Sequence, residues 1–211
     1  MAGLTAQQMQ YEAKIMYEAI AGADAPGYSD KQWSVILTQA QENFILSLAV
    51  SGMDFDELTR RSIANLIVEE NVEEDNIEPY PFIVSAYRVN LSDKFLHILK
   101  DTANHSVKVK PVSYDFVHAN SENPFEKPYD REYWRLTGKK SVIIVTDGEE
   151  LETYDIIFIK RPSPIIIAEN ITIEEYDDGN VLHSELDPVT HRSIVKEAAK
   201  LAFEYTRNVN Q

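Results

Sequence analysis

Residues that carry out chemistry in enzymes are present, but their spacing fits no catalytic motif. Gly138-Lys139-Lys140-Ser141 resembles the end of a phosphate-binding loop, which needs a further glycine five residues before Gly138. Tyr133 stands at that position, so we expect no phosphate cradle. Of the five histidines, no two lie at the spacing of a zinc-binding helix; they are His97, His105, His118, His183 and His191. We therefore expect no metal, no cofactor and no catalytic residue.

Adjacent carboxylates are frequent, and they raise the question of acid–base hydrolysis. They are Glu69-Glu70, Glu73-Glu74, Glu149-Glu150 and Asp177-Asp178. A general acid needs a buried carboxyl group whose pKa is raised by its surroundings. These pairs lie in turns and hydrophilic runs, where water keeps both groups charged. We interpret them as solvated surface rather than as a glycosidase-type site.

One region, residues 127–140, combines basic and aromatic side chains. Its cations are Lys127, Arg131, Arg135, Lys139 and Lys140, and its aromatic residues are Tyr129, Tyr133 and Trp134. Such a mixture can stack on single-stranded nucleic acid. Three acids in and beside the same region, at positions 126, 130 and 132, bring its charge close to balance. Contact with an acidic neighbouring subunit is the preferred interpretation, and a soluble strand edge is the alternative.

The overall charge excludes several classes of protein. The chain has 35 acidic and 20 basic residues, a net charge of −15. A protein that binds nucleic acid needs a basic surface that displaces counterions from phosphates. Cysteine is absent, which excludes disulfides and thiolate metal sites. No run approaches the roughly 18–20 apolar residues that cross a bilayer, and the first residues lack a signal-peptide pattern, so no membrane partner is expected.

The secondary-structure elements that position these residues include predicted helices at both ends of the chain. Thr5 with Gln8, and Ser29 with Gln32, form capping boxes that predict helices ending near Gly22 and Gly52. A third helix is expected from residue 54 to 67, which makes residues 1–68 a helical hairpin or bundle. The last predicted helix lies in residues 184–211, because Asp187 can cap it and Pro188 suits its first position.

The middle of the chain changes character. Residues 69–78 hold six acids in ten positions and are expected to form a solvated linker or helix extension, within a boundary segment 69–81. Residues 82–183 are predicted to be β-rich, with a loop over 118–131 and a short strand at 165–167. The runs 141–146 and 154–160 are expected to form a hairpin. The predicted fold is α+β, with N-terminal helices, a central antiparallel β region and a C-terminal helix in one composite domain.

Several runs, taken in order, resemble structural proteins of crAss-like phages and related Bacteroides phages. They are YEAI at 17–20, APGYSDK at 25–31, LTQAQ at 37–41, VKPVSYD at 109–115, NPFEKP at 123–128, WRL at 134–136, RPSPII at 161–166 and ELDPVTHRSIV at 185–195. The resemblance spans most of the chain. One departure is Ser184, where the pattern has cysteine. The change is small and leaves the resemblance intact.

The resemblance implies a structural, non-enzymatic virion protein that forms a ring in the phage neck, between the portal and the tail. It implies a homo-oligomer, expected to hold twelve copies, that contacts the portal and other neck or tail rings. The genome would pass through an acid-lined channel without adhering. Such a protein is made in the cytoplasm of the bacterial host. The alternatives are a virion-associated hydrolase and an assembly adaptor that leaves the particle.

Loops rich in proline, asparagine and aromatic residues suit fixed contacts between subunits better than catalysis. The candidate subunit interface is Pro26, Gly27, Asn123, Pro124, Phe125, Lys127, Pro128, Tyr133, Trp134 and Arg135.

Overall fold

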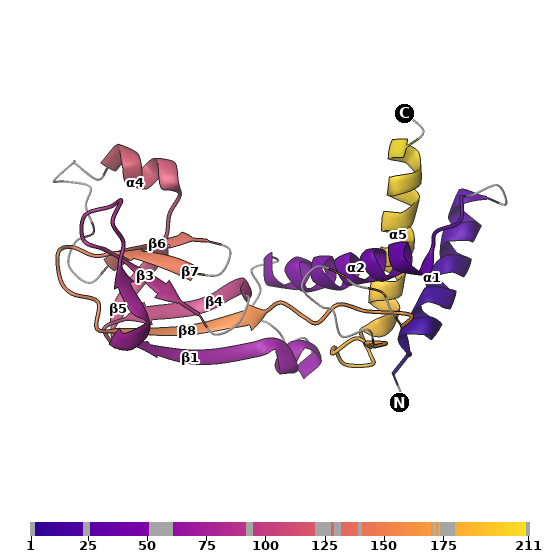
Figure 1. The fold of residues 1–211 in the computed structure, drawn as a ribbon, viewed down its shortest axis with the longest axis horizontal. Helices are drawn as coiled ribbons and strands as arrows, with labels where there is room; N and C mark the ends of the chain where they lie inside the picture. Colours follow the sequence, from indigo (N-terminus) through magenta and orange to yellow (C-terminus); the bar gives the residue numbers. More distant parts are fainter. Residues whose placement is uncertain are drawn as a thin grey trace. The chain divides into compact units, whose positions relative to one another are not determined.

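The computed structural model describes residues 3–22, 26–50, 61–91, 95–120, 128, 132–138, 141–169, 171, 173 and 180–209. The chain separates into two compact units. Residues 1–66 with 162–211 form the helical unit, and residues 67–161 form the sheet unit. The α+β class, the N-terminal helices and the C-terminal helix are confirmed (Figure 1). A single composite domain stays a prediction.

The helical unit contains α1 (Ala6–Ala21), α2 (Asp30–Val50) and α5 (His191–Val209). Both capping boxes are confirmed: Thr5 and Ser29 each accept a hydrogen bond from the backbone of the glutamine three residues on, whose side chain accepts one in return. α1 ends at Gly22, whose φ of 90° is a conformation that glycine adopts readily. Helical spacing from Met9, Ala13 and Tyr17 predicts Ile20 on the same apolar face of α1, but Ile20 is 56% exposed.

The core of the helical unit lies where α1 and α2 pack against α5. Its buried side chains include Met9, Ala13, Tyr17, Trp33, Leu37, Ile194, Val195, Ala198 and Ala202. Tyr28 adds a hydrogen bond from its hydroxyl to the Ala202 carbonyl, at 2.7 Å. The three helices are therefore held together by one apolar core, although they come from opposite ends of the chain.

The third predicted helix differs from expectation. Residues 61–63 are helical, a 3-10 turn (η1, Ala64–Leu66) follows, and a strand begins at Ile67. Helical spacing predicts Leu66 on the apolar face and Ile63 near the edge of that face, and both are buried. The placement of Ile67 in the helix is wrong, because Ile67 starts β1, in which more buried and exposed positions alternate from Val68 to Glu73 as in a half-buried strand. Phe55 and Leu58 lie outside the described residues.

An extended segment, residues 163–167, lies along α2. A row of polar side chains of α2 forms hydrogen bonds with the backbone of this segment. Ser34 accepts from the backbone N–H of Ile167 at 3.2 Å, and Thr38 accepts from that of Ile165 at 3.0 Å. The Gln41 amide donates to the carbonyl of Ser163 at 3.0 Å. The strand predicted at 165–167 is thus only a single bridge, between residues 166 and 182, and the helix supplies the partners that a sheet would otherwise provide.

The sheet unit contains eight strands, with a 3-10 turn η2 (Glu74–Asn76) and a short helix α4 (Tyr114–Asn120). The strands are β1 (Ile67–Glu73), β2 (Ile77–Pro79), β3 (Ala86–Asn90), β4 (Phe95–Ala103), β5 (Val107–Pro111), β6 (Glu132–Thr137), β7 (Ser141–Val145) and β8 (Thr153–Lys160). Their order across the sheet is β1-β8-β4-β5-β6-β7-β3-β2. Only β5 and β6, among these strands, pair in parallel. The predicted antiparallel character is therefore correct for most of the sheet.

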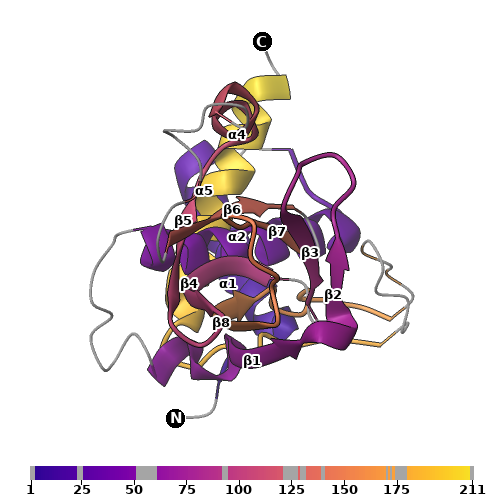
Figure 2. The ribbon, with the colours of Figure 1, turned by 90° about the vertical axis from the view of Figure 1, so that its left-hand side faces the viewer.

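The sheet is curled into a near-barrel. Its two edge strands, β1 and β2, follow each other in the chain and are joined by the three residues of η2. So short a connection requires the two edges to lie close together, and Figure 2 shows the strands arranged in a ring. The interior is filled by buried side chains, among them Val72, Val89, Tyr133, Ile144, Tyr154 and Phe158. A second cluster covers the outer face of β3, β6 and β7 beneath α4.

Three predictions in this unit are wrong. Residues 69–78 are not a linker or helix extension but most of β1, η2 and the start of β2, because Val68 and Val72 pack in the core while Glu69, Asn71 and Glu73 on the other strand face are exposed. Residues 118–120, expected in a loop, end α4. The expected 141–146/154–160 hairpin does not form, since β7 pairs with β3 and β6 whereas β8 pairs with β1 and β4.

Candidate interaction site

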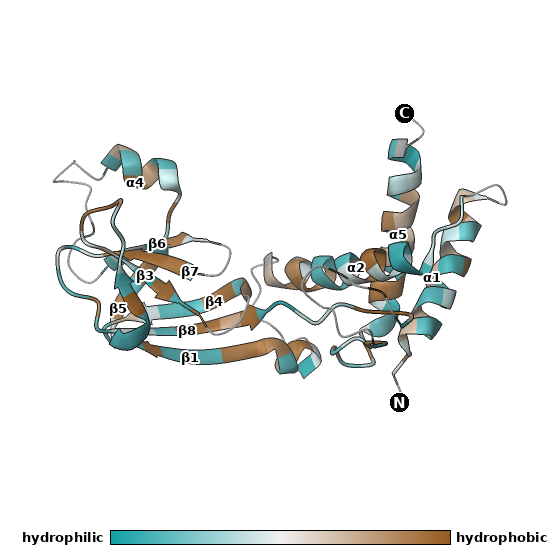
Figure 3. Ribbon diagram, viewed as in Figure 1, coloured by the Kyte–Doolittle hydropathy of each residue, from teal (hydrophilic) through white to brown (hydrophobic). Residues whose placement is uncertain are grey.

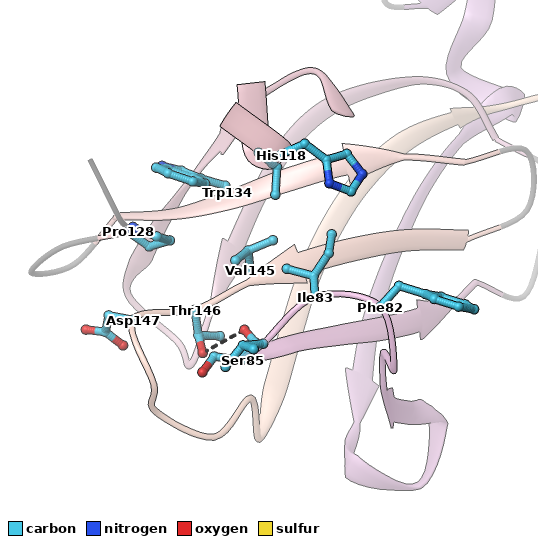
Figure 4. Close-up of a pocket in the computed structure, with 11 residues that line it drawn as sticks. Phe82, Ile83, Ser85, His118, Pro128, Trp134, Val145, Thr146 and Asp147 are labelled. Atoms are coloured by element: carbon cyan, nitrogen blue, oxygen red, sulfur yellow. Dashed lines mark hydrogen bonds between the residues drawn. The ribbon is translucent and has the colours of Figure 1, made fainter. Parts of the chain in front are cut away.

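A hollow lies on the outer face of the sheet unit, between the turn 81–85, α4 and the strands β6 and β7 (Figure 4). Its volume is about 280 Å³. The lining is mainly apolar and includes Phe82, Ile83, Val117, Trp134 and Val145. Polar groups stand at its rim, where His118, Thr146 and Asp147 are found. We call this hollow, with the turn beside it, the outer pocket.

The turn beside the outer pocket presents apolar side chains to solvent. Phe82 is 77% exposed and Val84 is 90% exposed. Ser85 follows them with a φ of 56°, which is unusual for a residue with a side chain. The Ser85 carbonyl accepts hydrogen bonds from the Thr146 backbone at 2.8 Å and hydroxyl at 3.2 Å. These bonds hold the turn to the end of β7, so its apolar side chains are held in an exposed position.

Because successive side chains of a strand point to opposite faces of the sheet, the residues of the predicted basic and aromatic region that lie on β6 are divided between two faces. Trp134 points to the outer face, where its ring lies edge-on to Phe116 with 5.1 Å between centroids. Pro128 is buried and lines the same pocket, so two predicted interface residues come together here. Tyr133 belongs to the interior core, and Arg135, two residues on, shares its face of the strand. A single strand thus sends the predicted residues to opposite sides of the sheet.

Arg135 belongs to a buried polar network in the near-barrel. Its Nη1 lies 2.7 Å from Oδ2 of Asp101, and the two side chains are only 10% and 7% exposed. The same carboxylate oxygen accepts a hydrogen bond from the Tyr154 hydroxyl at 2.7 Å. Burial, reinforced by the charge of Asp101, raises the pKa of Tyr154 well above its usual range. The sequence motifs did not indicate Asp101 or Tyr154. The feature that could have indicated them is an acid and a tyrosine at core-facing positions of strands with alternating polarity.

Two further groups titrate abnormally near this network. Burial, followed by the positive charge of Arg135, lowers the pKa of His97. Burial, followed by the charges of Asp147 and Glu149, raises the pKa of Tyr133 to about 12. Acid–base catalysis works best with a pKa near the working pH. The hydroxyl groups of Tyr133 and Tyr154 therefore remain protonated at neutral pH and donate hydrogen bonds to Glu149 and Asp101.

The remaining interface candidates are spread over the chain. Pro26 and Gly27 are exposed in the helical unit, and the Pro26 carbonyl accepts a hydrogen bond from Tyr17 at 3.1 Å. Asn123, Pro124, Phe125 and Lys127 lie outside the described residues. The structure thus brings together only Pro128 and Trp134 among the described candidates. The subunit interface as a whole stays a prediction.

Two histidines bind backbone groups at the start of α1. His183 Nδ1 accepts from the N–H of Ala6 at 3.1 Å, and His191 Nδ1 accepts from that of Leu4 at 3.0 Å. Within the described ranges, no three histidine, aspartate or glutamate side chains are grouped so as to hold a metal ion. None of the described helices is long and apolar enough to cross a membrane.

Comparison with known sequences decides the family. The model of phage tail ring protein 3/4 matches residues 4–210. The chain belongs to this family. Ring protein 4/5 of Bacteroides phage crAss001 is 28% identical over 221 residues, covering 94% of this chain and 92% of that protein. Ring protein 3 of the same phage is 23% identical over 202 residues, covering 81% of this chain and 82% of that protein.

Membership of the phage tail ring protein 3/4 family confirms the resemblance stated from the sequence motifs. The match includes both units, so the helical unit and the sheet unit belong to the same family pattern. The relatives are named as ring proteins, which agrees with a structural rather than an enzymatic role.

Proposed function

We propose that this chain is a structural virion protein that forms a homo-oligomeric ring in the phage neck, between the portal and the tail, and encloses the channel through which the genome passes. The observation that carries the proposal is the family match over residues 4–210. A ring subunit must carry two different surfaces that fit each other, so that each copy binds the next around the axis.

The outer pocket supports this proposal as one such surface. Large apolar side chains held in exposed positions are what protein interfaces bury at their centres. Phe82 and Val84 meet this description. Trp134 and Pro128 line the hollow beside them, which links the pocket to the interface predicted from the sequence. In the ring, a neighbouring subunit covers this turn.

The net charge supports passage of DNA without adhesion. The chain carries −15, and a ring of twelve copies would multiply this charge around the axis. A surface of that sign repels phosphates, so duplex DNA would slide through without being held. Among the described segments, the acids of residues 74–78, which follow β1, and of residues 147–152 would face the channel.

Imaging of purified virions tests the proposal. We expect ring-shaped density between portal and tail into which twelve copies of this chain fit, and mass spectrometry that finds the chain in mature particles. A mature particle that lacks the polypeptide would favour an assembly adaptor that leaves after acting. A chain located away from the neck would contradict the connector role while leaving the family assignment intact.

A further inference from the structure

The last helix carries a basic stripe on its exposed face. Arg192, Lys196 and Lys200 follow at intervals of four residues, and each is exposed. Four residues of an α-helix advance about 6 Å and turn about 40° beyond a full circle, so the three cations form a row on one face. Glu204, also exposed, follows at the same interval and interrupts the row, and Arg207 beyond it falls on the same face and lies against the Phe203 ring. We call the four basic residues the α5 stripe.

The opposite face of α5 is already occupied. Ile194, Val195, Ala198, Leu201 and Ala202 are buried against α1 and α2. The α5 stripe therefore faces away from the core of the helical unit. Among the described residues, its one ion pair is between Lys200 and Glu197, with 3.9 Å between Nζ and Oε1. A pair of this length on an exposed surface stabilises the helix little.

The sheet unit carries a row of the opposite charge on β1. Glu69, Asn71 and Glu73 are exposed on one face of this edge strand, while Val72 is buried on the other. Asn71 donates a hydrogen bond to Asp155 of β8, which places a third carboxylate in the row. In Figure 3 the colour of β1 changes from brown at its apolar start to teal along this acidic part. We call Glu69, Glu73 and Asp155 the β1 row.

The two rows match in spacing as well as in sign. Alternate residues of a strand are about 6.7 Å apart, close to the 6 Å that separates successive cations of the α5 stripe. From Arg192 to Lys200 the helix extends about 12 Å, and from Glu69 to Glu73 the strand extends about 13 Å. Arg192 and Lys200 can therefore each meet a glutamate when a helix lies along the strand, and Lys196 then lies opposite Asn71 and its partner Asp155.

We propose that the α5 stripe of one copy binds the β1 row of the next copy, as a head-to-tail contact of the ring. The inference rests on the proposed function, which requires two unlike surfaces on each subunit. Complementary rows of charge fix the register and orientation of such a contact more than they raise its affinity.

Duplex DNA is the competing partner for a basic stripe. Phosphates attract arginine and lysine, and four cations on one helix face could contact a duplex. The rest of the chain opposes this, because its net charge is −15. The same acids that repel DNA provide the stripe with a partner of matching length, which is why a second copy is favoured.

Charge reversal of each surface in the full-length chain tests the contact. Variant A is Arg192→Glu with Lys196→Glu, and variant B is Glu69→Lys with Glu73→Lys. Each variant should weaken self-association by about tenfold or more, measured by sedimentation velocity at low salt, because like charges then face each other. An equal mixture of A and B should restore assembly to within about twofold of the unaltered chain, since acidic stripes then meet basic rows and basic stripes meet acidic rows.

A matched control carries Lys31→Glu with Lys108→Glu, which changes the net charge as variant A does at exposed sites outside the stripe. It should assemble like the unaltered chain, and all variants should keep the same thermal midpoint.

If the unaltered chain assembles and A and B do so equally well, the stripe contact is wrong but the ring is not. If the unaltered chain stays monomeric at every concentration, the homo-oligomeric ring itself is contradicted. Binding of a duplex oligonucleotide that A loses while still assembling would assign the stripe to DNA.

Discussion

Asp101 accepts contacts from both Arg135 and Tyr154 in an interior where water is scarce. A buried ion pair contributes modestly to stability as a pair, but removal of one partner leaves the other charge without compensation. Because of this asymmetry, we expect substitution of Asp101 to destabilise the sheet unit strongly. Arg135, a residue of the interface predicted from the sequence, is paired with Asp101 inside its own subunit.

We expect Asp101→Asn to lower the free energy of unfolding by about 3–5 kcal/mol, because the Arg135 guanidinium would be buried without an anion. Urea denaturation of the two proteins measures the difference. The control is the double variant Asp101→Leu with Arg135→Met, which removes both charges and should cost less than Asp101→Asn alone. Equal stability of Asp101→Asn and the unaltered chain would show that the buried network does not contribute to the free energy of unfolding in this way.

His97 makes the stability of the sheet unit depend on acidic pH. In the unfolded chain a histidine binds its proton near pH 6.5, whereas burial and Arg135 lower the pKa of His97 in the folded protein. Between these two values the unfolded chain binds more protons, so the free energy of unfolding falls as pH falls below about 6.5. His97→Gln should show a shallower loss over this range in urea titrations at stepped pH. The same acid slope in both proteins would exclude His97 as a cause.

At the scale of elements, α2 acts as a partner for an extended segment. Ser34, Thr38 and Gln41 lie at spacings of four and three residues, which puts them on one helix face. Thr38 and Gln41 join segments 37–41 and 161–166, which are two of the motifs that carry the family resemblance. The structure explains both motifs together, because one supplies the hydrogen-bonding groups that the backbone of the other requires.

Replacement of Ser34 by alanine should lower the free energy of unfolding by about 1–3 kcal/mol, since the buried Ile167 N–H would lose its acceptor. Ser47→Ala is the matched control on the same helix: Ser47 is exposed and its hydroxyl donates only to a carbonyl of its own helix. The control should stay within about 0.5 kcal/mol of the unaltered chain. Thermal and urea unfolding of both variants make the comparison.

The turn of the outer pocket leads to a prediction about assembly rather than stability. Phe82→Ser with Val84→Ser should weaken self-association by about tenfold or more, because an interface would lose its central apolar contacts. The thermal midpoint should stay the same, since both side chains are exposed in the single chain. Tyr11→Ser with Ile15→Ser, also exposed but on α1, is the control. Unchanged assembly would mean that no neighbour covers the turn.

At the scale of the whole molecule, the two units differ in how the chain forms them. The sheet unit is one continuous stretch, residues 67–161, whereas the helical unit needs both ends of the chain. α5 supplies the surface on which α1 and α2 pack. Neither end of the chain alone therefore holds a complete helical core.

A fragment of residues 67–161 should fold by itself, with the circular dichroism of a β protein and dispersed amide resonances. A fragment of residues 1–66 should stay largely unfolded, because isolated short helices are marginal without tertiary packing. Addition of residues 162–211 in trans should restore helicity. A folded 1–66 fragment, or an unfolded 67–161 fragment, would contradict the division.

The sequence by itself determined the local elements and the family. Capping residues placed the starts of α1 and α2, because these signals act over a few neighbouring residues. The last helix was predicted to start at Pro188 with Asp187 as its cap, but it begins at His191. Ordered motifs indicated a ring protein, as the family match confirms.

Only the tertiary structure decided which strands pair and which side chains are exposed. The pairing of β7 with β3 and β6, and the strand character of the acidic run 69–78, depend on partners far away in the chain. Secondary-structure propensity describes the preference of a residue's own backbone. Whether a strand is at an edge, or a charged side chain is buried, depends instead on the residues that pack against it. Arg135 and Trp134 are adjacent in sequence, yet one is enclosed with Asp101 and the other lines an open pocket.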